Sequence, residues 1–198
     1  MHDEQEPTKV VTDVRTLRAI AHPLRTRLLS LLRLEGPASA TELARRTGES
    51  SGATSYHLRQ LARYGYIEDD AARDGRERRW RAATRTTSWE TADFIDDPAG
   101  LAVSDALERR LVQRAVGQFE AWMARRLEAD PDWLRAATMG DDTLRLTPSQ
   151  ARAFDREIGE VRRRFLESPP AAAAGEPVAL VAFYYQLLPF DRLEDLDR

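Results

Sequence analysis

Hydroxyl and guanidinium side chains recur at helical spacing between Ser51 and Arg63. Residues three and four positions apart share a face of a helix. One face would bury the stripe Thr54, Leu58, Leu61 and Gly65. The opposite, outward face would carry Ser51, Gly52, Ser55, Tyr56, Arg59 and Arg63. Hydroxyls and guanidiniums suit base edges and phosphates, so this stretch predicts a nucleic-acid-binding helix over 51–64.

Two further groups could add to this surface. His57 falls between the two faces, and helix periodicity leaves open whether it donates to a phosphate or packs half-buried. A polar turn from Asp69 to Gly75 separates two short strands, which predicts a hairpin. The candidate contacts around this hairpin, over 69–79, are Arg73, Arg76 and Arg78. Trp80 alternates with Arg79 and Arg81, so we expect its ring to pack against the helices.

Three shorter helices must position the helix over 51–64. The first is predicted over 13–21, and Pro23 begins the second, which ends at Glu35-Gly36-Pro37. Ser39 and Glu42 form a capping box for the third, and Gly48 ends it. Short helices followed by a two-stranded hairpin make a winged helix-turn-helix over 13–82.

The charge of the chain is unevenly distributed. Residues 13–81 hold 14 basic and 9 acidic side chains, whereas the whole 198-residue chain has a net charge of −3. A basic segment on an acidic protein favours a module that binds polyanions.

Residues 13–82 resemble the ArsR-type winged helix-turn-helix regulators. The matching stretches are His22-Pro23-Leu24-Arg25, Thr41-Glu42-Leu43-Ala44, Ser55 to Leu61, Gly65-Tyr66-Ile67 and Gly75-Arg76. The resemblance implies a dimeric DNA-binding repressor, with the helix over 51–64 in the major groove and the first and C-terminal helices pairing the subunits. The cysteines of the metal-sensing members are missing from the third helix, so the resemblance does not extend to a metal response.

The remainder of the chain predicts a linker over 83–100 and a dimerisation and effector domain over 101–198. A long helix over 101–127 carries an apolar stripe, and with 13–21 it is the expected homodimer contact. Thr143–Thr147 alternates like a strand, and Val178–Leu188 is an apolar, aromatic stretch. A helix opens at Thr147 between them, which predicts a strand-helix-strand unit. Five large side chains there could line a pocket for a small apolar effector or be plain core: Trp133, Met139, Phe183, Tyr184 and Tyr185. The fold class expected is mainly α with small β (α+β).

Other classes of protein find no support in the sequence. The chain has no cysteine, and its three histidines lack zinc-ligand spacing, so we expect no metal and no cofactor. Neither a phosphate-binding glycine loop nor a nucleophile elbow occurs, which argues against an enzyme. No apolar run is long enough for a membrane span, and the polar start lacks signal-peptide features, so a cytoplasmic location is expected. The alternative function is a winged-helix module that binds a protein instead of DNA.

Overall fold

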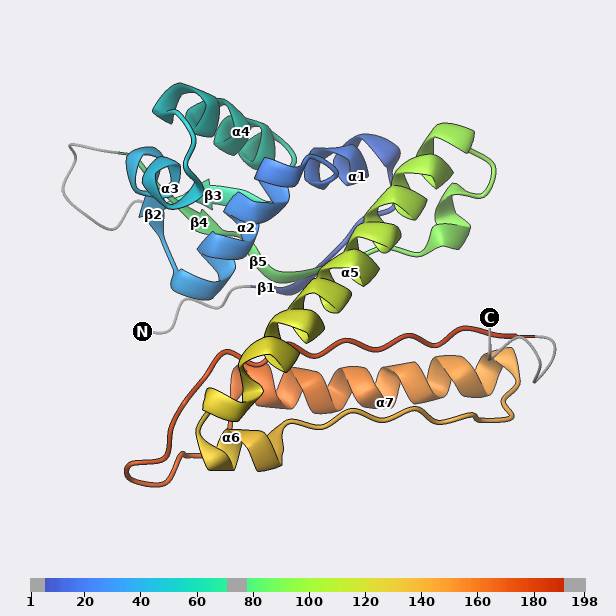
Figure 1. The fold of residues 1–198 in the computed structure, drawn as a ribbon. Helices are drawn as coiled ribbons and strands as arrows, with labels where there is room; N and C mark the ends of the chain where they lie inside the picture. Colours follow the sequence, from blue (N-terminus) through green and yellow to red (C-terminus); the bar gives the residue numbers. More distant parts are fainter. Residues whose placement is uncertain (1–5, 71–77, 191–198) are drawn as a thin grey trace. The chain divides into compact units, whose positions relative to one another are not determined.

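The computed structural model describes residues 6–70 and 78–190. The chain divides into two compact units between Val116 and Gly117. Figure 1 shows the elements of both units along the chain. The described helices include none that is long and apolar enough to cross a membrane.

The N-terminal unit contains the predicted helices and hairpin. Its helices are α1 (Val14–Ile20), α2 (Pro23–Glu35), α3 (Ala40–Thr47), α4 (Ser51–Arg63), the 3-10 turn η1 (Thr91–Phe94) and the first part of α5 (Pro98–Arg125). Its strands are β1 (Glu6–Val10), β2 (Ala38–Ser39), β3 (Ile67–Asp69), β4 (Arg79–Ala82) and β5 (Thr84–Ser88). The winged helix-turn-helix architecture predicted for 13–82 is confirmed.

Capping side chains fix where the first helices begin. The Asp13 carboxylate caps α1, and His22 Nδ1 caps α2 by accepting from the backbone N–H of Leu24. At α3 the Ser39 hydroxyl and the Glu42 carboxylate each accept a backbone N–H of the other residue, at 3.2 and 2.8 Å. This predicted capping box satisfies amide groups that a helix start otherwise leaves without partners.

One hydrophobic core lies between the helices and the hairpin. Every helix from α1 to α4 contributes leucines to it, and β4 contributes Trp80, as predicted. The fully buried members with large side chains include Leu17, Leu28, Leu32, Leu43, Leu58, Leu61 and Tyr66. Burial of each leucine stabilises the fold by about 1.5–3 kcal/mol relative to an exposed side chain, so this cluster is the main support of the unit.

Two small sheets complete the unit. The first has the order β2-β4-β3 and is antiparallel, with Ile67 opposite Ala82 and Asp69 opposite Trp80. The second pairs β1 in parallel with β5, which the sequence did not predict. The Arg33 guanidinium of α2 braces β5, because it donates to the Thr84 carbonyl and the Thr87 hydroxyl at 2.9 and 2.8 Å. Burial lowers the pKa of Arg33 to about 10.

The segment over 83–100, expected as a linker, carries regular structure. It contains β5, η1 and the first turn of α5. Phe94 is buried, and the Trp89 indole donates to the Ser104 hydroxyl of α5 at 2.9 Å. Arg110 of α5 donates to the Ala21 carbonyl at the end of α1. The first part of α5 therefore belongs to the N-terminal unit.

The C-terminal unit contains the end of α5, η2 (Arg126–Glu128), α6 (Pro131–Ala136) and α7 (Pro148–Glu167). The helix of the predicted strand-helix-strand unit is confirmed, including its capping box of Thr147 and Gln150. The strands predicted over 143–147 and 178–188 are wrong, because the described sheets contain neither segment. Alternation or an apolar, aromatic run marks a segment that could form a strand, whereas a strand also needs a paired neighbour.

The five side chains proposed for a core or a pocket do not form a core within the chain. Phe183, Tyr184, Tyr185 and Met139 are exposed, and Trp133 is half-buried. The Phe183 and Tyr185 rings stack with centroids 5.5 Å apart. The Tyr184 hydroxyl donates to Gln118 at 2.6 Å, and the Tyr185 hydroxyl donates to Asp155 at 2.7 Å. These bonds hold the extended segment over 178–190 at two points.

Candidate nucleic-acid interface

A tight turn joins α3 to α4. Gly48 adopts φ 75° and ψ 20°, the left-handed conformation that ends α3 and that other residues adopt at a cost. The chain then reverses through Glu49, and the Ser50 hydroxyl caps α4 by accepting from the Ala53 N–H at 3.2 Å. The N-terminus of α4 therefore follows α3 directly, as in a helix-turn-helix.

The inner face of α4 is anchored by three of the four residues predicted for it, whereas Gly65 is exposed. Thr54, Leu58 and Leu61 are fully buried in the core of the N-terminal unit. Gly65, with φ 68°, follows the helix and lets the chain turn into β3. Because three successive turns are held on one side, the orientation of α4 about its own axis is fixed.

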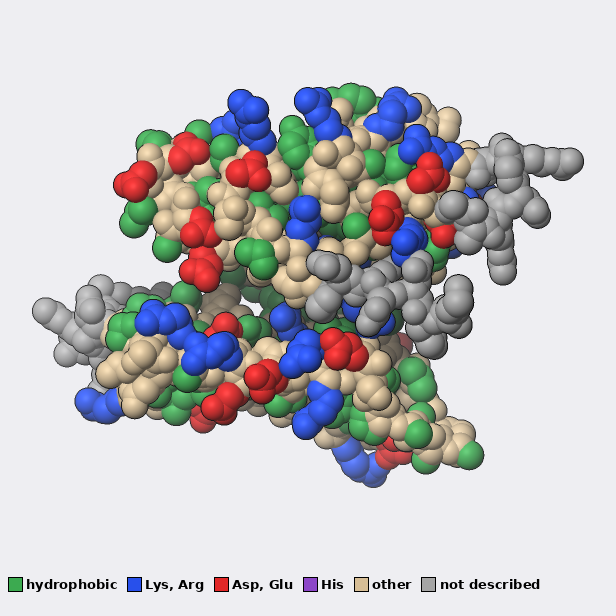
Figure 2. Space-filling model, turned by 180° about the vertical axis from the view of Figure 1, so that it is seen from behind, with side chains coloured by type: hydrophobic (Ala, Val, Ile, Leu, Met, Phe, Trp, Pro, Cys, Tyr) green, Lys and Arg blue, Asp and Glu red, His purple; other side chains and the backbone are tan. Residues whose placement is uncertain are grey.

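The outer face of α4 exposes the predicted side chains. Ser51, Gly52, Tyr56, Arg59 and Arg63 are exposed, and Ser55 is half-buried beside them. Basic side chains gather in Figure 2 along the top edge of the N-terminal unit, the edge at which Figure 1 places α1 and α4. This face combines hydroxyl groups near the helix start with guanidiniums near its end.

His57 is half-buried and contacts another histidine. Its ring centroid lies 4.3 Å from that of His22, the cap of α2, and 5.2 Å from that of Tyr56. Burial lowers the pKa of His57, and the charges of His22 and Arg25 lower it further. Burial likewise lowers the pKa of His22, so both rings favour the neutral form. The packing alternative considered for His57 fits this geometry, and a phosphate contact stays a prediction.

Arg25 was missed by the sequence argument. It is a half-buried residue of α2 whose guanidinium donates to the carbonyls of Ala19 and Arg18 at the end of α1. Burial lowers the pKa of Arg25, and its charge lowers the pKa of His57, so the guanidinium lies close to α4. The sequence signal that could have identified Arg25 is its position as a basic residue in the first turn of α2, which begins at Pro23.

The wing is described only at its base. Arg78 is exposed, pairs with Asp69 at 2.7 Å and places its guanidinium 4.1 Å from the centre of the Trp80 ring. An exposed ion pair of this kind contributes about 0–1 kcal/mol, so a phosphate could replace Asp69 as its partner. Arg73 and Arg76 lie outside the described residues.

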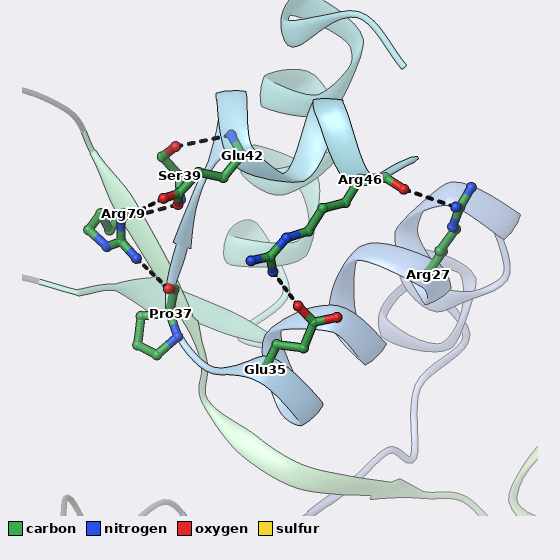
Figure 3. A network of polar contacts seen from close by, with 7 residues as sticks. All are labelled: Arg27, Glu35, Pro37, Ser39, Glu42, Arg46 and Arg79. Atoms are coloured by element: carbon green, nitrogen blue, oxygen red, sulfur yellow. Dashed lines mark hydrogen bonds and ion pairs between the residues drawn. The ribbon is translucent and has the colours of Figure 1, made fainter. Parts of the chain in front are cut away.

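Polar contacts fix α3 against α2 and the wing (Figure 3). Arg27 of α2 donates to the Thr47 and Arg46 carbonyls at the end of α3, at 3.0 and 3.1 Å. The Arg46 side chain pairs with Glu35. At the other end of α3, Arg79 of β4 pairs with Glu42 at 3.1 Å and donates to the Pro37 carbonyl. These contacts fix the positions of α3 and the base of the wing relative to each other.

Comparison with known proteins places this geometry in a family. Residues 20–69 match the model of the helix-turn-helix domain, which spans α2 to β3. A solved structure described as a possible transcriptional regulator for arsenical resistance is 30% identical over 54% of this chain and 97% of that chain, with a TM-score of 0.32. The chain therefore carries a helix-turn-helix domain over residues 20–69 and is similar to ArsR-family regulators. The family resemblance drawn from the sequence is therefore confirmed.

Two other solved structures are similar to this ArsR-like chain. One is the winged helix-turn-helix DNA-binding domain of Mb0332 from Mycobacterium bovis, described as homodimeric, with 21% identity and a TM-score of 0.33. The alignment covers 52% of this chain and 76% of the Mb0332 domain. The other is reduced HlyU from Vibrio cholerae, with 23% identity and a TM-score of 0.33. That alignment covers 50% of this chain and 86% of HlyU. Among proteins of curated function, none matches the chain.

Proposed function

We propose that this ArsR-like protein is a cytoplasmic, sequence-specific DNA-binding repressor that acts as a homodimer. In this proposal α4 enters the major groove, and the wing over 69–79 contacts the flanking backbone or minor groove. The observation that carries the proposal is the division of α4 into a buried aliphatic face and an outer face of hydroxyls and guanidiniums.

The two ends of the outer face of α4 have different roles in this proposal. Ser51, Gly52 and Ser55 at the start of α4 are small, so the helix can approach base edges closely. Arg59 and Arg63 lie further along, where guanidiniums can reach guanine or phosphate. Tyr56 can donate its hydroxyl to a base edge or phosphate. Within the described chain Arg59 has no ion-pair partner, so binding DNA costs no internal contact.

The homodimer follows from the reach of a single recognition helix. One such helix contacts only a few base pairs, and a two-fold pair doubles the site. In α1, Leu17, Ala19 and Ile20 are already buried within the chain, which leaves its outer side for a partner. The apolar stripe of α5 is buried only at Leu107 and is exposed at Leu111. This distribution supports α5 as the larger part of the proposed contact over 13–21 and 101–127.

The test measures binding of the full chain to DNA from its own promoter region by fluorescence anisotropy at several salt concentrations. Arg59→Ala should weaken binding by about 1–3 kcal/mol if the guanidinium reads guanine, which is roughly 5- to 150-fold. Arg63→Ala should lower the slope of log affinity against log salt by about one if it contacts a phosphate. Arg135→Ala, an exposed arginine of α6, serves as the matched control.

Two results would count against the proposal. Affinity and salt slope that stay unchanged in both α4 variants would show that α4 does not contact DNA. Absence of promoter binding together with capture of a defined protein partner would favour the protein-interaction alternative.

A further inference from the structure

The outer side of α1 carries two arginines that the DNA contact proposed above does not use. The three buried residues of this helix face the core of the N-terminal unit. Arg15 and Arg18 are exposed, and their spacing of three residues places them on one face of the helix. Among residues 6–70 and 78–190, neither guanidinium has a carboxylate partner. Both charges are therefore available to an anionic partner.

α1 is fixed beside the recognition helix α4. The Arg25 guanidinium, which lies close to α4, donates to the Arg18 carbonyl at 2.9 Å and to the Ala19 carbonyl. Tyr66, which follows α4, donates its hydroxyl to the Thr16 carbonyl of α1 at 2.9 Å. The two helices pack against each other, and Figure 1 shows them along the same edge of the N-terminal unit. A partner bound along α4 therefore has α1 as its neighbour.

The edge formed by α1 and α4 is positively charged. The two helices contain no acidic residue, and they expose four arginines, Arg15, Arg18, Arg59 and Arg63. Basic side chains gather along this edge in Figure 2. The flanking carboxylates are Asp13, which caps α1, and Glu49 in the turn before α4. By contrast, α2 and α3 each contain a glutamate that pairs with an arginine.

The chemistry of this edge fits a polyanion better than a second protein chain. A two-fold dimer uses the same surface on both copies, so a contact through the outer side of α1 would bring like charges together. The centre of a homodimer interface is mostly apolar, whereas the apolar residues of α1 are already buried within the chain. DNA offers a row of phosphate charges along its backbone, and arginine is a common partner of these phosphates.

We propose that Arg15 and Arg18 of α1 bind backbone phosphates of the DNA that flanks the base pairs contacted by α4. The inference rests on the proposed function and extends its DNA contact from α4 and the wing to α1. It also narrows the proposed homodimer contact to 101–127. Phosphate contacts carry no sequence information, so the two arginines add affinity and fix the orientation of the duplex without changing the base preference.

The experiment measures binding of the full chain to two DNA duplexes by fluorescence anisotropy at several salt concentrations. One duplex comes from its own promoter region, and the other has the same composition in scrambled order. If each arginine neutralises one phosphate, Arg15→Gln combined with Arg18→Gln should lower the slope of log affinity against log salt by about 1.8. At 0.1 M salt this loss corresponds to a weakening of roughly 60-fold at most. The ratio of the two affinities should stay as in the wild type.

A matched control removes the same charge from another helix. Arg152 and Arg156 of α7 are exposed and lie one helical turn apart, and neither has an ion-pair partner in the described chain. Changing both to glutamine lowers the net charge of −3 by two, as the α1 variant does. The α7 variant should keep the affinity and the salt slope of the wild type. Light scattering and urea unfolding show whether each variant keeps its mass and its fold.

The outcomes separate this inference from the proposed function. The inference is overturned if the α1 variant keeps the wild-type salt slope, if the α7 variant loses as much affinity, or if the α1 variant changes mass. A change of mass would assign the outer side of α1 to the homodimer contact. If Arg59→Ala weakens promoter binding and the α1 variant does not, only the inference fails. If the wild type binds both duplexes equally and the α1 variant has the lower slope, only the sequence-specific function fails.

Discussion

Thr54 offers a test of how α4 is anchored. It is fully buried on the inner face of α4, and within the described chain its hydroxyl has no hydrogen-bond partner. A buried polar group without a partner costs about 1–3 kcal/mol. Valine has nearly the same shape and keeps the branched Cβ, so Thr54→Val should remove that cost and add a buried methyl group worth about 0.8 kcal/mol. We expect the free energy of unfolding to rise by about 2–4 kcal/mol.

Thr47 supplies the matched control. It is also a buried helical threonine, but its hydroxyl donates to the Leu43 carbonyl at 2.8 Å. Thr47→Val loses that bond, so we expect it to leave stability unchanged or lower it by about 1 kcal/mol. Urea unfolding followed by circular dichroism measures both variants. If Thr54→Val proved no more stable than Thr47→Val, the hydroxyl of Thr54 would have a partner and the packing described for α4 would be incorrect.

Three further predictions concern the same unit. Leu58→Ala should lower the free energy of unfolding by about 2–5 kcal/mol, because it opens a cavity in the core, and a loss under 1 kcal/mol by urea unfolding would contradict the burial of α4. Ser39→Ala removes the capping box of α3 and should cost about 1 kcal/mol in the same assay, whereas Thr41→Ala, at an exposed position, should cost little. Because burial lowers the pKa of His22 and His57 below 6.5, the unfolded chain binds more protons than the folded one beneath that pH. Stability should therefore be greatest above pH 6.5 and fall as the pH drops below it, and a His57→Gln variant with the same pH profile as the wild type would refute this reasoning.

The sequence predicts the helix-turn-helix because each local signal there agrees with the others. Ser39 and Glu42 mark the start of α3, Gly48 marks its end, and Leu58 and Leu61 mark the inner face of α4. These signals act over three or four residues, within the range that capping and periodicity describe. The outer face of α4 follows from the inner face, so most of the candidate interface could be assigned before the structure.

Other elements depend on contacts that no local pattern records. The sequence of β1 is mostly polar and predicts an irregular tail. It forms a strand because it pairs in parallel with β5. Arg25 reaches the vicinity of α4 because its guanidinium is held by the end of α1. The predictions for 143–147 and 178–188 failed in the opposite way, because the composition and pattern of both segments favour strands but the described part of the chain provides no neighbouring strand.

The pairing of β1 with β5 affects how the DNA-binding half can be isolated. Val11, directly after β1, is buried, and its N–H donates to the Ser88 carbonyl at 2.9 Å. A shortened chain that begins at residue 13, where the helical pattern starts, would uncover this part of the core and leave β5 with an open edge. Open edges recruit strands from other molecules and lead to aggregation. A fragment intended for binding or spectroscopic work should therefore retain the residues from Glu6 onward.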